Sequence, residues 1–331
     1  MHINDIKDID NIKDIKDIND ILKIHNDDRH IAKDVEAVVT SFNQGSMILE
    51  AIHSLCCQTT PPAKIILVDD GSTDAESVRI LNAIQSSPGL PVPLTVLRRP
   101  NGGVSAARNT GIRQAQTSLT LVLDGDDRLE PSYIEEVSHL LRNHPSMVAA
   151  SSRMHTFGIL DATVCPCGGG ITAFLARNCC PATHILRHEI WEQCGGYDES
   201  MQSGFEDWDF FLSMLETSPD TFIGIVEKPL IDYRTAPASS NVTSMEKRLD
   251  LMRFLIQKHI DSYRNHVTEA LLGIESISIS RLYGWESEIL RTLASGQKPC
   301  SLSGEFMAHP SYGDGGMAAA VRIASSNPRR T

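Results

Sequence analysis

The chain has 331 residues, a hydrophobic share of 41% and a formal net charge of −12 at pH 7, enough apolar material for one large α/β domain with extra segments or for two modest domains. The acidic balance argues against binding nucleic acid, or an anionic membrane, through bulk electrostatics. No apolar run approaches the roughly 18–20 residues that span a membrane, and no signal peptide opens the chain. We therefore expect a cytoplasmic protein without a transmembrane segment, while peripheral membrane association stays open.

The first 34 residues are of low complexity. Isoleucine recurs at every third position with Asp, Asn and Lys between, a spacing that matches neither the period of a helix nor that of a strand. On a helix such a stripe winds around the axis and does not hold one face. We expect residues 1–34 to be a loose helix or a partly disordered arm, with an oligomerisation or docking segment as the functional alternative. The isoleucines are Ile3, Ile6, Ile9, Ile12, Ile15, Ile18 and Ile21.

After this arm the chain alternates between predicted strands and helices. Residues 35–40, 65–68 and 94–97 are short apolar runs typical of buried strands, and apolar residues at helical spacing cover 47–58 and 75–85. This alternation predicts a doubly wound parallel sheet.

The same rhythm continues downstream. A helix is predicted over 131–142 and a strand from 148, followed by a glycine- and cysteine-bearing loop or hairpin over 151–170. Residues 185–194 read as a short strand that turns into a helix. Gly195-Gly196 end that helix, since glycine suits a left-handed C-cap.

A glycine-rich loop follows the strand 94–97 and leads into a helix that runs to about residue 115. Its pair Gly102-Gly103 fits neither the G-x-G-x-x-G frame of dinucleotide-binding folds nor the G-K-[ST] frame of P-loops. Gly-rich loops before helices often cradle phosphates with backbone N–H groups. Arg108 has the guanidinium that suits a diphosphate, and its alternative reading is an ordinary surface arginine on a helix face.

Three acids follow the apolar strand 119–123 directly. Asp124, Asp126 and Asp127 would lie at the carboxyl end of that strand, where open α/β sheets bind their ligands. Carboxylates packed so closely repel one another unless a cation neutralises them, and hard oxygen ligands suit Mg²⁺ or Mn²⁺. A solvated acidic turn before the next helix is the alternative.

Glu206 and Asp207 fall at the start of an amphipathic helix. The exposed N–H groups and the dipole of a helix N-terminus favour carboxylates there without any function. The functional alternative is a general base, a carboxylate at a loop–helix junction that takes a proton from an incoming hydroxyl.

The eight cysteines lack the even spacing of a secreted disulfide scaffold. Four of them could be imagined as a zinc cluster, but their spacing is not that of a zinc ribbon or finger. We expect reduced, mostly buried thiols. The four are Cys165, Cys167, Cys179 and Cys180.

Taken in order and spacing, the separate motifs resemble those of the family 2 glycosyltransferases, over roughly residues 35–244. The resemblance implies a GT-A fold, a nucleotide-sugar donor, a divalent metal, Mn²⁺ or Mg²⁺, and transfer with inversion. The family's processive synthases carry a Gln-x-x-Arg-Trp motif, whereas no Trp of this chain follows an Arg, so we expect one sugar per encounter. The motifs are 40–43 (TSFN), 68–74 (VDDGSTD), 101–111 (NGGVSAARNTG), 124–127 (DGDD), 195–199 (GGYDE) and 206–209 (EDWD).

The resemblance also implies roles for single residues. Thr40 and Asp70 would form the nucleoside pocket, with Asp70 accepting a hydrogen bond from the base. Asp126 resembles the metal ligand of the D-x-D motif, with Asp124 and Asp127 beside it near the ribose and diphosphate.

Asp207 matches the catalytic base of the family, and Glu206 precedes it as in the family. The segment 229–234 is similar to a Tyr-Arg element that follows the base helix, but a histidine often found two residues later is replaced by Ala236. Contacts of that segment with donor or metal therefore stay open.

The expected organisation is a GT-A domain over 35–244, a helical extension over 245–294 and a flexible tail over 295–331, whose composition is rich in Gly, Ser, Ala and Pro. The acceptor could be a saccharide, a lipid-linked molecule or a protein. One alternative is a catalytically inactive nucleotide-sugar-binding or interaction protein. A nucleotidyltransferase is a further one, but the Gly-rich loop with Arg and Lys typical of such enzymes is absent after Val39.

Overall fold

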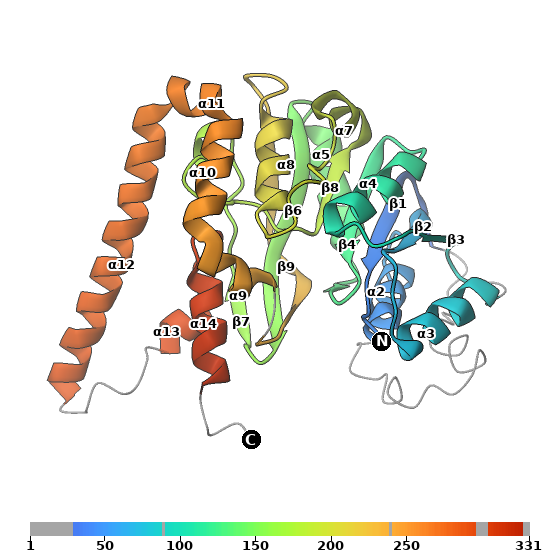
Figure 1. The fold of residues 1–331 in the computed structure, drawn as a ribbon, viewed down its shortest axis with the longest axis horizontal. Coiled ribbons are helices and arrows are strands. Elements are labelled where there is room, and N and C mark those ends of the chain that lie inside the picture. Colours follow the sequence, from blue (N-terminus) through green and yellow to red (C-terminus); the bar gives the residue numbers. More distant parts are fainter. Residues whose placement is uncertain (1–28, 88–89, 238–239, 296–303, 327–331) are drawn as a thin grey trace.

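The computed structural model describes residues 29–87, 90–237, 240–295 and 304–326. The expected Ile-rich arm therefore lies outside the described residues except for its last six positions. Figure 1 shows a sheet with helices packed against it and, at one end, the long helix α12 (Val267–Ser295).

One mixed sheet runs through the described part of the chain, and its nine strands appear in the spatial order β3-β2-β1-β4-β8-β6-β9-β5, with β7 paired to β6. The strands are β1 (Ala32–Ser41), β2 (Pro62–Asp69), β3 (Leu94–Arg98), β4 (Leu119–Asp124), β5 (Arg128–Leu129), β6 (Met147–Gly158), β7 (Ala162–Val164), β8 (His184–Arg187) and β9 (Phe222–Thr235). The first four strands of that order are parallel, whereas β8 runs antiparallel to β4. The expected α/β class with a parallel, doubly wound half is confirmed.

Strand ends differ from the prediction in two places. β1 begins at Ala32, earlier than expected, because Ala32 already pairs with Pro62 of β2. β9 was not predicted, since polar residues and Pro229 interrupt its pattern. It nevertheless pairs in parallel with β6, and the register shifts next to Arg153, the partner of Pro229. The expected hairpin after residue 150 is present as β6 and β7.

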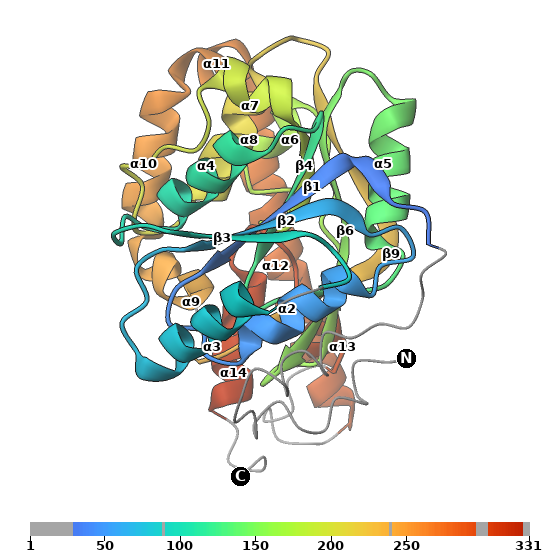
Figure 2. The ribbon, with the colours of Figure 1, turned by 90° about the vertical axis from the view of Figure 1, so that its right-hand side faces the viewer.

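Helices on both sides of the sheet bury two separate apolar cores. Figure 2 shows α4 on one side of strands β1–β3 and α2 and α3 on the other. Successive residues of β1 alternate between these cores, with Val39 in one and Val38 in the other, as strand geometry requires. The helices are α2 (Met47–Cys56), α3 (Ala75–Ser86), α4 (Val104–Gln114), α5 (Tyr133–Asn143), α6 (Ile171–Phe174), α7 (His188–Cys194) and α8 (Glu206–Leu215).

The approach of α4 to the sheet depends on a glycine. A Cβ added at Gly111 would lie 2.3 Å from Cγ1 of Val38 and 3.1 Å from Cγ2 of Val68. Real side chains do not tolerate such distances, so the helix and the strands can be this close only without a side chain at that position.

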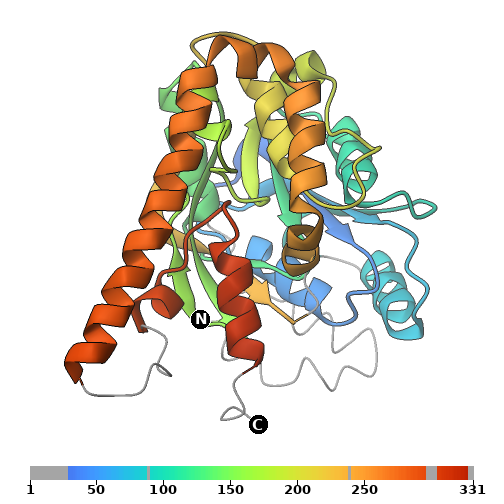
Figure 3. The ribbon, with the colours of Figure 1, turned by 60° about the vertical axis from the view of Figure 1, so that its left-hand side comes forward.

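Helices after the sheet form the C-terminal part, as expected: α9 (Ser240–Ser244), α10 (Arg248–Lys258), α11 (Ile260–Asn265) and α12. Figure 3 shows α12 along one side of the molecule. Several large apolar side chains of this helix are exposed, including Leu272, Tyr283 and Trp285. Nevertheless, none of the helices in the described ranges combines the length and the hydropathy needed to cross a bilayer.

A buried ionic network fastens these helices to α8. His259 lies 3.1 Å from Asp209 and 2.9 Å from Glu216, and Lys258 lies 2.8 Å from the other oxygen of Asp209. Burial acts to lower the pKa of His259, but its hydrogen bonds to the two carboxylates outweigh burial and raise that pKa.

The expectation of a loose tail from residue 295 is wrong for part of it. The helices α13 (Gly304–Ala308) and α14 (Gly316–Ser325) lie within that tail. The reason is apolar burial, because Ala320 and Val321 of α14 pack in a small core with Leu160 and Ala162 of the β6–β7 hairpin. A tail rich in small residues can still supply a helix face that closes a core.

Candidate functional site

A cavity of about 1020 Å³ opens at the carboxyl ends of β1, β2 and β4. The start of α8, the end of β9, the segment before α10 and the loop before α14 complete its walls. All eight residues singled out from the sequence line it, although they come from five separate segments. They are Thr40, Asp70, Arg108, Asp124, Asp126, Asp127, Glu206 and Asp207.

The parallel register of the sheet brings the first of these residues together. Thr40 of β1 pairs with Asp124 of β4, and the Thr40 hydroxyl donates a hydrogen bond to Oδ1 of Asp124 over 3.2 Å. Gly125 then turns the chain where no side chain fits, because a Cβ there would lie 2.6 Å from the Thr40 carbonyl oxygen and 2.2 Å from Oε1 of Gln44. This turn aims Asp126 and Asp127 into the cavity wall.

Arg234 of β9 holds the acidic turn from the other side. Its backbone N–H donates to Oδ1 of Asp127 over 2.8 Å, and its Nε donates to the carbonyl oxygen of Asp126 over 2.9 Å. Burial, with the neighbouring Asp124 carboxylate adding to it, raises the pKa of Asp126 to about 6. Burial, and after it the carboxylates of Asp126 and Asp124, raise the pKa of Asp127 well above its usual range.

This excess of buried negative charge fits a cation. Among the described residues, no three His, Cys, Asp or Glu side chains gather closely enough to hold a metal by themselves. Mg²⁺ in nucleotide enzymes is usually held by one or two carboxylates together with substrate phosphates and water, without an all-protein cage. The acids Asp124, Asp126 and Asp127 therefore suit an ion whose remaining ligands come from a diphosphate.

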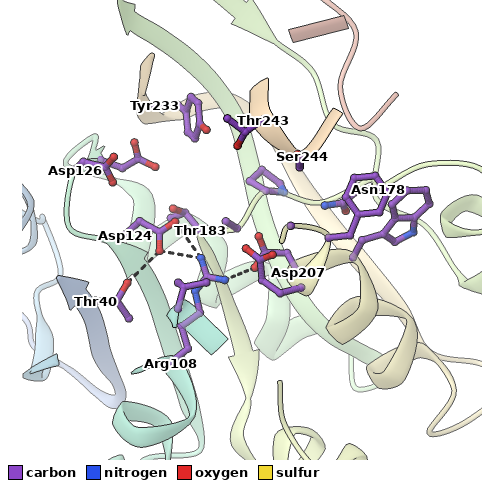
Figure 4. Close-up of a pocket in the computed structure, with 18 of the residues that line it drawn as sticks. Thr40, Arg108, Asp124, Asp126, Asn178, Thr183, Asp207, Tyr233, Thr243 and Ser244 are labelled. Atoms are coloured by element: carbon purple, nitrogen blue, oxygen red, sulfur yellow. Dashed lines mark hydrogen bonds and ion pairs between the residues drawn. The ribbon is translucent and has the colours of Figure 1, made fainter. Parts of the chain in front are cut away.

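Asp207 lies at the opposite side of the cavity from the acidic turn (Figure 4). Burial raises its pKa to about 7, against the lowering effect of the Arg108 guanidinium, while the charges of Glu206 and Asp124 add to the rise. A carboxylate with a pKa near neutrality is matched to the work of a general base. Phe205, directly before α8, has a left-handed backbone with φ of 67°, which fixes the entry into the helix that carries Asp207.

Arg108 connects the two acidic groups. Its side chain is buried, Nη2 donates to both oxygens of Asp124 over 2.8 and 3.0 Å, and Nη1 donates to Oδ1 of Asp207 over 2.5 Å. Burial acts to lower the pKa of Arg108, but the two carboxylates outweigh it and raise that pKa. Figure 4 shows the guanidinium between the two acids, with Thr40 contacting Asp124 from the far side.

The expected diphosphate contact of Arg108 stays a prediction, because the structure shows its protein partners only. Both terminal nitrogens of its guanidinium are engaged by protein carboxylates. The partners are 16 and 99 residues away in the chain, so no local pattern could have identified them. Arg108 organises the site from beneath its surface.

Asp70 also has protein partners. Its carboxylate accepts hydrogen bonds from Nη1 of Arg99 over 2.9 Å and from the backbone N–H groups of Gly102 and Gly103, the latter over 2.8 Å. The acid thus pins the glycine-rich loop that leads into α4. Its predicted contact with a nucleotide base stays a prediction.

Several cavity residues were not predicted. Arg234 belongs to the Tyr-Arg element, and its strand β9 lacks the regular pattern of a strand. Lys247 and Arg248 precede or begin α10, and Tyr312 belongs to the supposed flexible tail. Sequence could not place Lys247, Arg248 and Tyr312, because none of the three belongs to a recognised motif.

The cysteines do not form a metal-binding group in the part of the chain that the structure describes. Cys179 and Cys180 are buried, whereas Cys165 and Cys167 are exposed. The expectation of mostly buried thiols is thus only partly right.

Comparison with known proteins agrees with the motifs. Residues 36–163 match the model of the family described as glycosyl transferase family 2. An uncharacterized glycosyltransferase of Bacillus subtilis, YwdF, is 25% identical over 235 residues, which cover 68% of this chain and 84% of that protein. An uncharacterized glycosyltransferase of Haemophilus influenzae is 27% identical over 241 residues, covering 69% and 79%.

Solved structures support the fold. Residues 1–349 of S. aureus TarS are similar with a TM-score of 0.53 and 18% identity, covering 76% of this chain and 74% of that one. The same fragment in complex with UDP-GlcNAc gives a TM-score of 0.54 and 16% identity, covering 71% and 72%. The mixed sheet with flanking helices and C-terminal helices is therefore the expected GT-A fold.

Proposed function

We propose, on the premise that residues 36–163 belong to glycosyl transferase family 2, that the chain transfers a sugar from a nucleoside diphosphate donor to an acceptor hydroxyl, with inversion at the anomeric carbon. The observation that carries the proposal is the set of contacts from Asp124 through Arg108 to Asp207. The buried guanidinium of Arg108 contacts both Asp124, at a strand end where α/β sheets bind ligands, and Asp207, whose pKa is raised to about 7. UDP is the favoured nucleotide, because the TarS fragment of similar fold has been solved with UDP and with UDP-GlcNAc.

Asp207 acts as the general base in this proposal. It takes the proton of the acceptor hydroxyl as that oxygen forms a bond to the anomeric carbon, and the bond from this carbon to the diphosphate breaks with its electron pair on the leaving oxygen. A base of this kind typically contributes about 10²–10⁴-fold in rate. A single displacement needs no second carboxylate as a covalent nucleophile.

Asp126 is the proposed metal ligand, with Asp124 and Asp127 beside it. A divalent ion bound there, Mn²⁺ or Mg²⁺, would neutralise negative charge that develops on the leaving diphosphate. The support is the raised pKa of Asp126, about 6, which burial and then the Asp124 carboxylate raise against the lowering effects of Arg234 and Arg108.

Thr40 and Asp70 line the cavity at the ends of β1 and β2, and we assign this end to the nucleoside. The proposed catalytic domain is 35–244. The extension 245–294 and the tail contribute to the acceptor side, since Arg248 and Tyr312 line the same cavity.

Thermal unfolding with and without nucleotide tests the donor half of the proposal. UDP with Mn²⁺ should raise the melting temperature more than CDP, GDP or UDP without the metal, because a ligand that binds only the folded state stabilises it. Hydrolysis or transfer of UDP-sugars then tests catalysis. Nucleotide binding with no turnover of any UDP-sugar would favour the alternative of an inactive nucleotide-sugar-binding protein.

A further inference from the structure

Three arginines line the cavity, and one of them differs from the other two. Arg108 is paired with Asp124 and Asp207, and Arg234 lies 2.8 Å from Glu50. Arg248 forms no ion pair with a carboxylate of the described residues, and its Nη1 donates a weak hydrogen bond of 3.8 Å to Sδ of Met245.

Aromatic rings hold the Arg248 guanidinium in place. Its Cζ lies 5.4 Å from the ring centroid of Phe205 and 5.8 Å from that of Trp208. Such stacking orients the cation and leaves the edge of the guanidinium available for hydrogen bonds. Lys247, the preceding residue, also lines the cavity and donates a hydrogen bond to Oγ of Ser203 over 3.3 Å.

The positive charge of Arg248 is incompletely compensated. Burial lowers its pKa, Asp314 opposes that change and Arg281 adds to it. Asp314 is already engaged by Arg281 and by hydrogen bonds from the Ser311 hydroxyl and the Gly316 N–H. A cation that is half-buried, oriented and short of a counterion is suited to an anion supplied by a ligand.

The position of this cation identifies the ligand. Phe205 and Trp208 flank Glu206 and Asp207 in sequence, so the aromatic rings beside Arg248 and the proposed base both lie at the start of α8. The acids assigned to the donor, Asp124 to Asp127, come from the strand end and not from this wall. The acceptor must approach from the side of the base, which is the side that Arg248 and Lys247 line.

We propose that Arg248, assisted by Lys247, forms a subsite for an anionic group of the acceptor, which makes the acceptor a phosphate- or carboxylate-bearing saccharide or polyol. The assignment of this anion to an acceptor rests on the proposed function, whereas the anion site itself does not depend on it. The ring of Phe205, which is only partly buried, would contact the apolar face of a sugar or polyol unit, and the guanidinium would bind the anion of that unit.

Isothermal titration with matched probe pairs tests the site directly. The pairs are glucose 6-phosphate against glucose and glucuronate against glucose, each titrated with and without UDP and Mn²⁺. The unmodified chain should bind the anionic member at least tenfold more tightly. Arg248→Gln should remove that preference while leaving UDP affinity unchanged. Arg253→Gln is the matched control, because Arg253 is an exposed arginine of the same helix paired with Asp250.

Equal affinity for anionic and neutral probes in the unmodified chain would overturn the inference, and so would a preference that survives in Arg248→Gln. Weakened UDP binding in that variant would also overturn it, by assigning the arginine to the donor. Failure of the proposed function is recognised separately, as absence of UDP binding in a chain that still prefers the anionic probe without nucleotide.

Discussion

Arg108→Gln would remove the cation that lies between Asp124 and Asp207 while keeping a side chain of similar length. In the structure this cation opposes the effect of burial on Asp207, whose pKa is about 7. An arginine beside an aspartate typically lowers the pKa of the acid by about 1–3 units. Without it, the pKa of Asp207 should rise to about 8–10.

The kinetic consequence can be worked out from that shift. The base must be ionised, and each pKa unit above the working pH reduces the ionised fraction about tenfold. At pH 7 the kcat/KM of the variant should therefore fall by roughly 5- to 500-fold through the base alone. The acidic limb of its pH profile should move upward, with activity partly recovered at alkaline pH.

The assay is UDP-sugar turnover between pH 5.5 and 10, with kcat/KM plotted against pH. Arg108→Lys retains the charge but not the two-sided hydrogen bonding, so its limb should stay near that of the unmodified chain while its maximal rate falls. Arg113→Gln, on the exposed side of the same helix, is the control. If the acidic limb of Arg108→Gln coincides with that of the control, the guanidinium does not set the protonation of the base.

Folding must be measured beside activity, because Arg108→Gln leaves two carboxylates without their cation. Breaking a buried pair in this way commonly costs about 3–5 kcal/mol. Circular dichroism at each pH separates unfolding from loss of the base. A folded variant with a shifted limb supports the reasoning in full.

Further predictions concern the other charged groups of the molecule. Asp207→Asn should keep UDP affinity and lose about 10²–10⁴-fold in transfer rate; transfer at the unmodified rate would remove the base assignment. Asp126→Ala should abolish the Mn²⁺-dependent part of UDP binding in a titration, and an unchanged metal requirement would place the ion elsewhere. His259→Ala should destabilise the fold by about 1.5–3 kcal/mol, since it removes hydrogen bonds to two carboxylates while Lys258 still pairs with Asp209, as measured by urea unfolding at pH 5.5. Because the folded pKa of His259 is raised, its stabilising effect is complete below the unfolded value of about 6.5 and is lost as pH rises through the folded value; a difference between the two proteins that grows towards alkaline pH would contradict this sign.

Local pattern was sufficient where a strand and its polar end are adjacent in sequence. The apolar run before Asp124 indicates a buried strand, and parallel neighbours must then place Thr40 beside that acid. The candidate residues at these strand and helix ends therefore share one cavity, and Arg108 of α4 lines it too.

Pairing over long distances was not accessible in the same way. The hydrogen bond between Arg108 and Asp207 joins residues 99 positions apart, and the sequence around either residue does not indicate the other as its partner. β9 cannot be predicted from local pattern, because Pro229 and charged residues interrupt the apolar run of a strand that pairs with β6. The helix α14 was missed because its burial depends on a hairpin more than a hundred residues earlier.

The contact between Gly111 and Val38 makes the chemistry sensitive to a position that does not line the cavity. Arg108 stands three residues earlier on the same helix. A methyl group added at position 111, between α4 and the sheet, would therefore push α4 outward and carry the guanidinium away from both carboxylates. Genetic variation at position 111 should thus produce an enzyme defect that no inspection of the cavity wall would explain. A mutational scan of α4 that measures only the amount of folded protein would miss this defect. A scan that measures sugar turnover should instead find position 111 as sensitive as the acidic residues of the cavity.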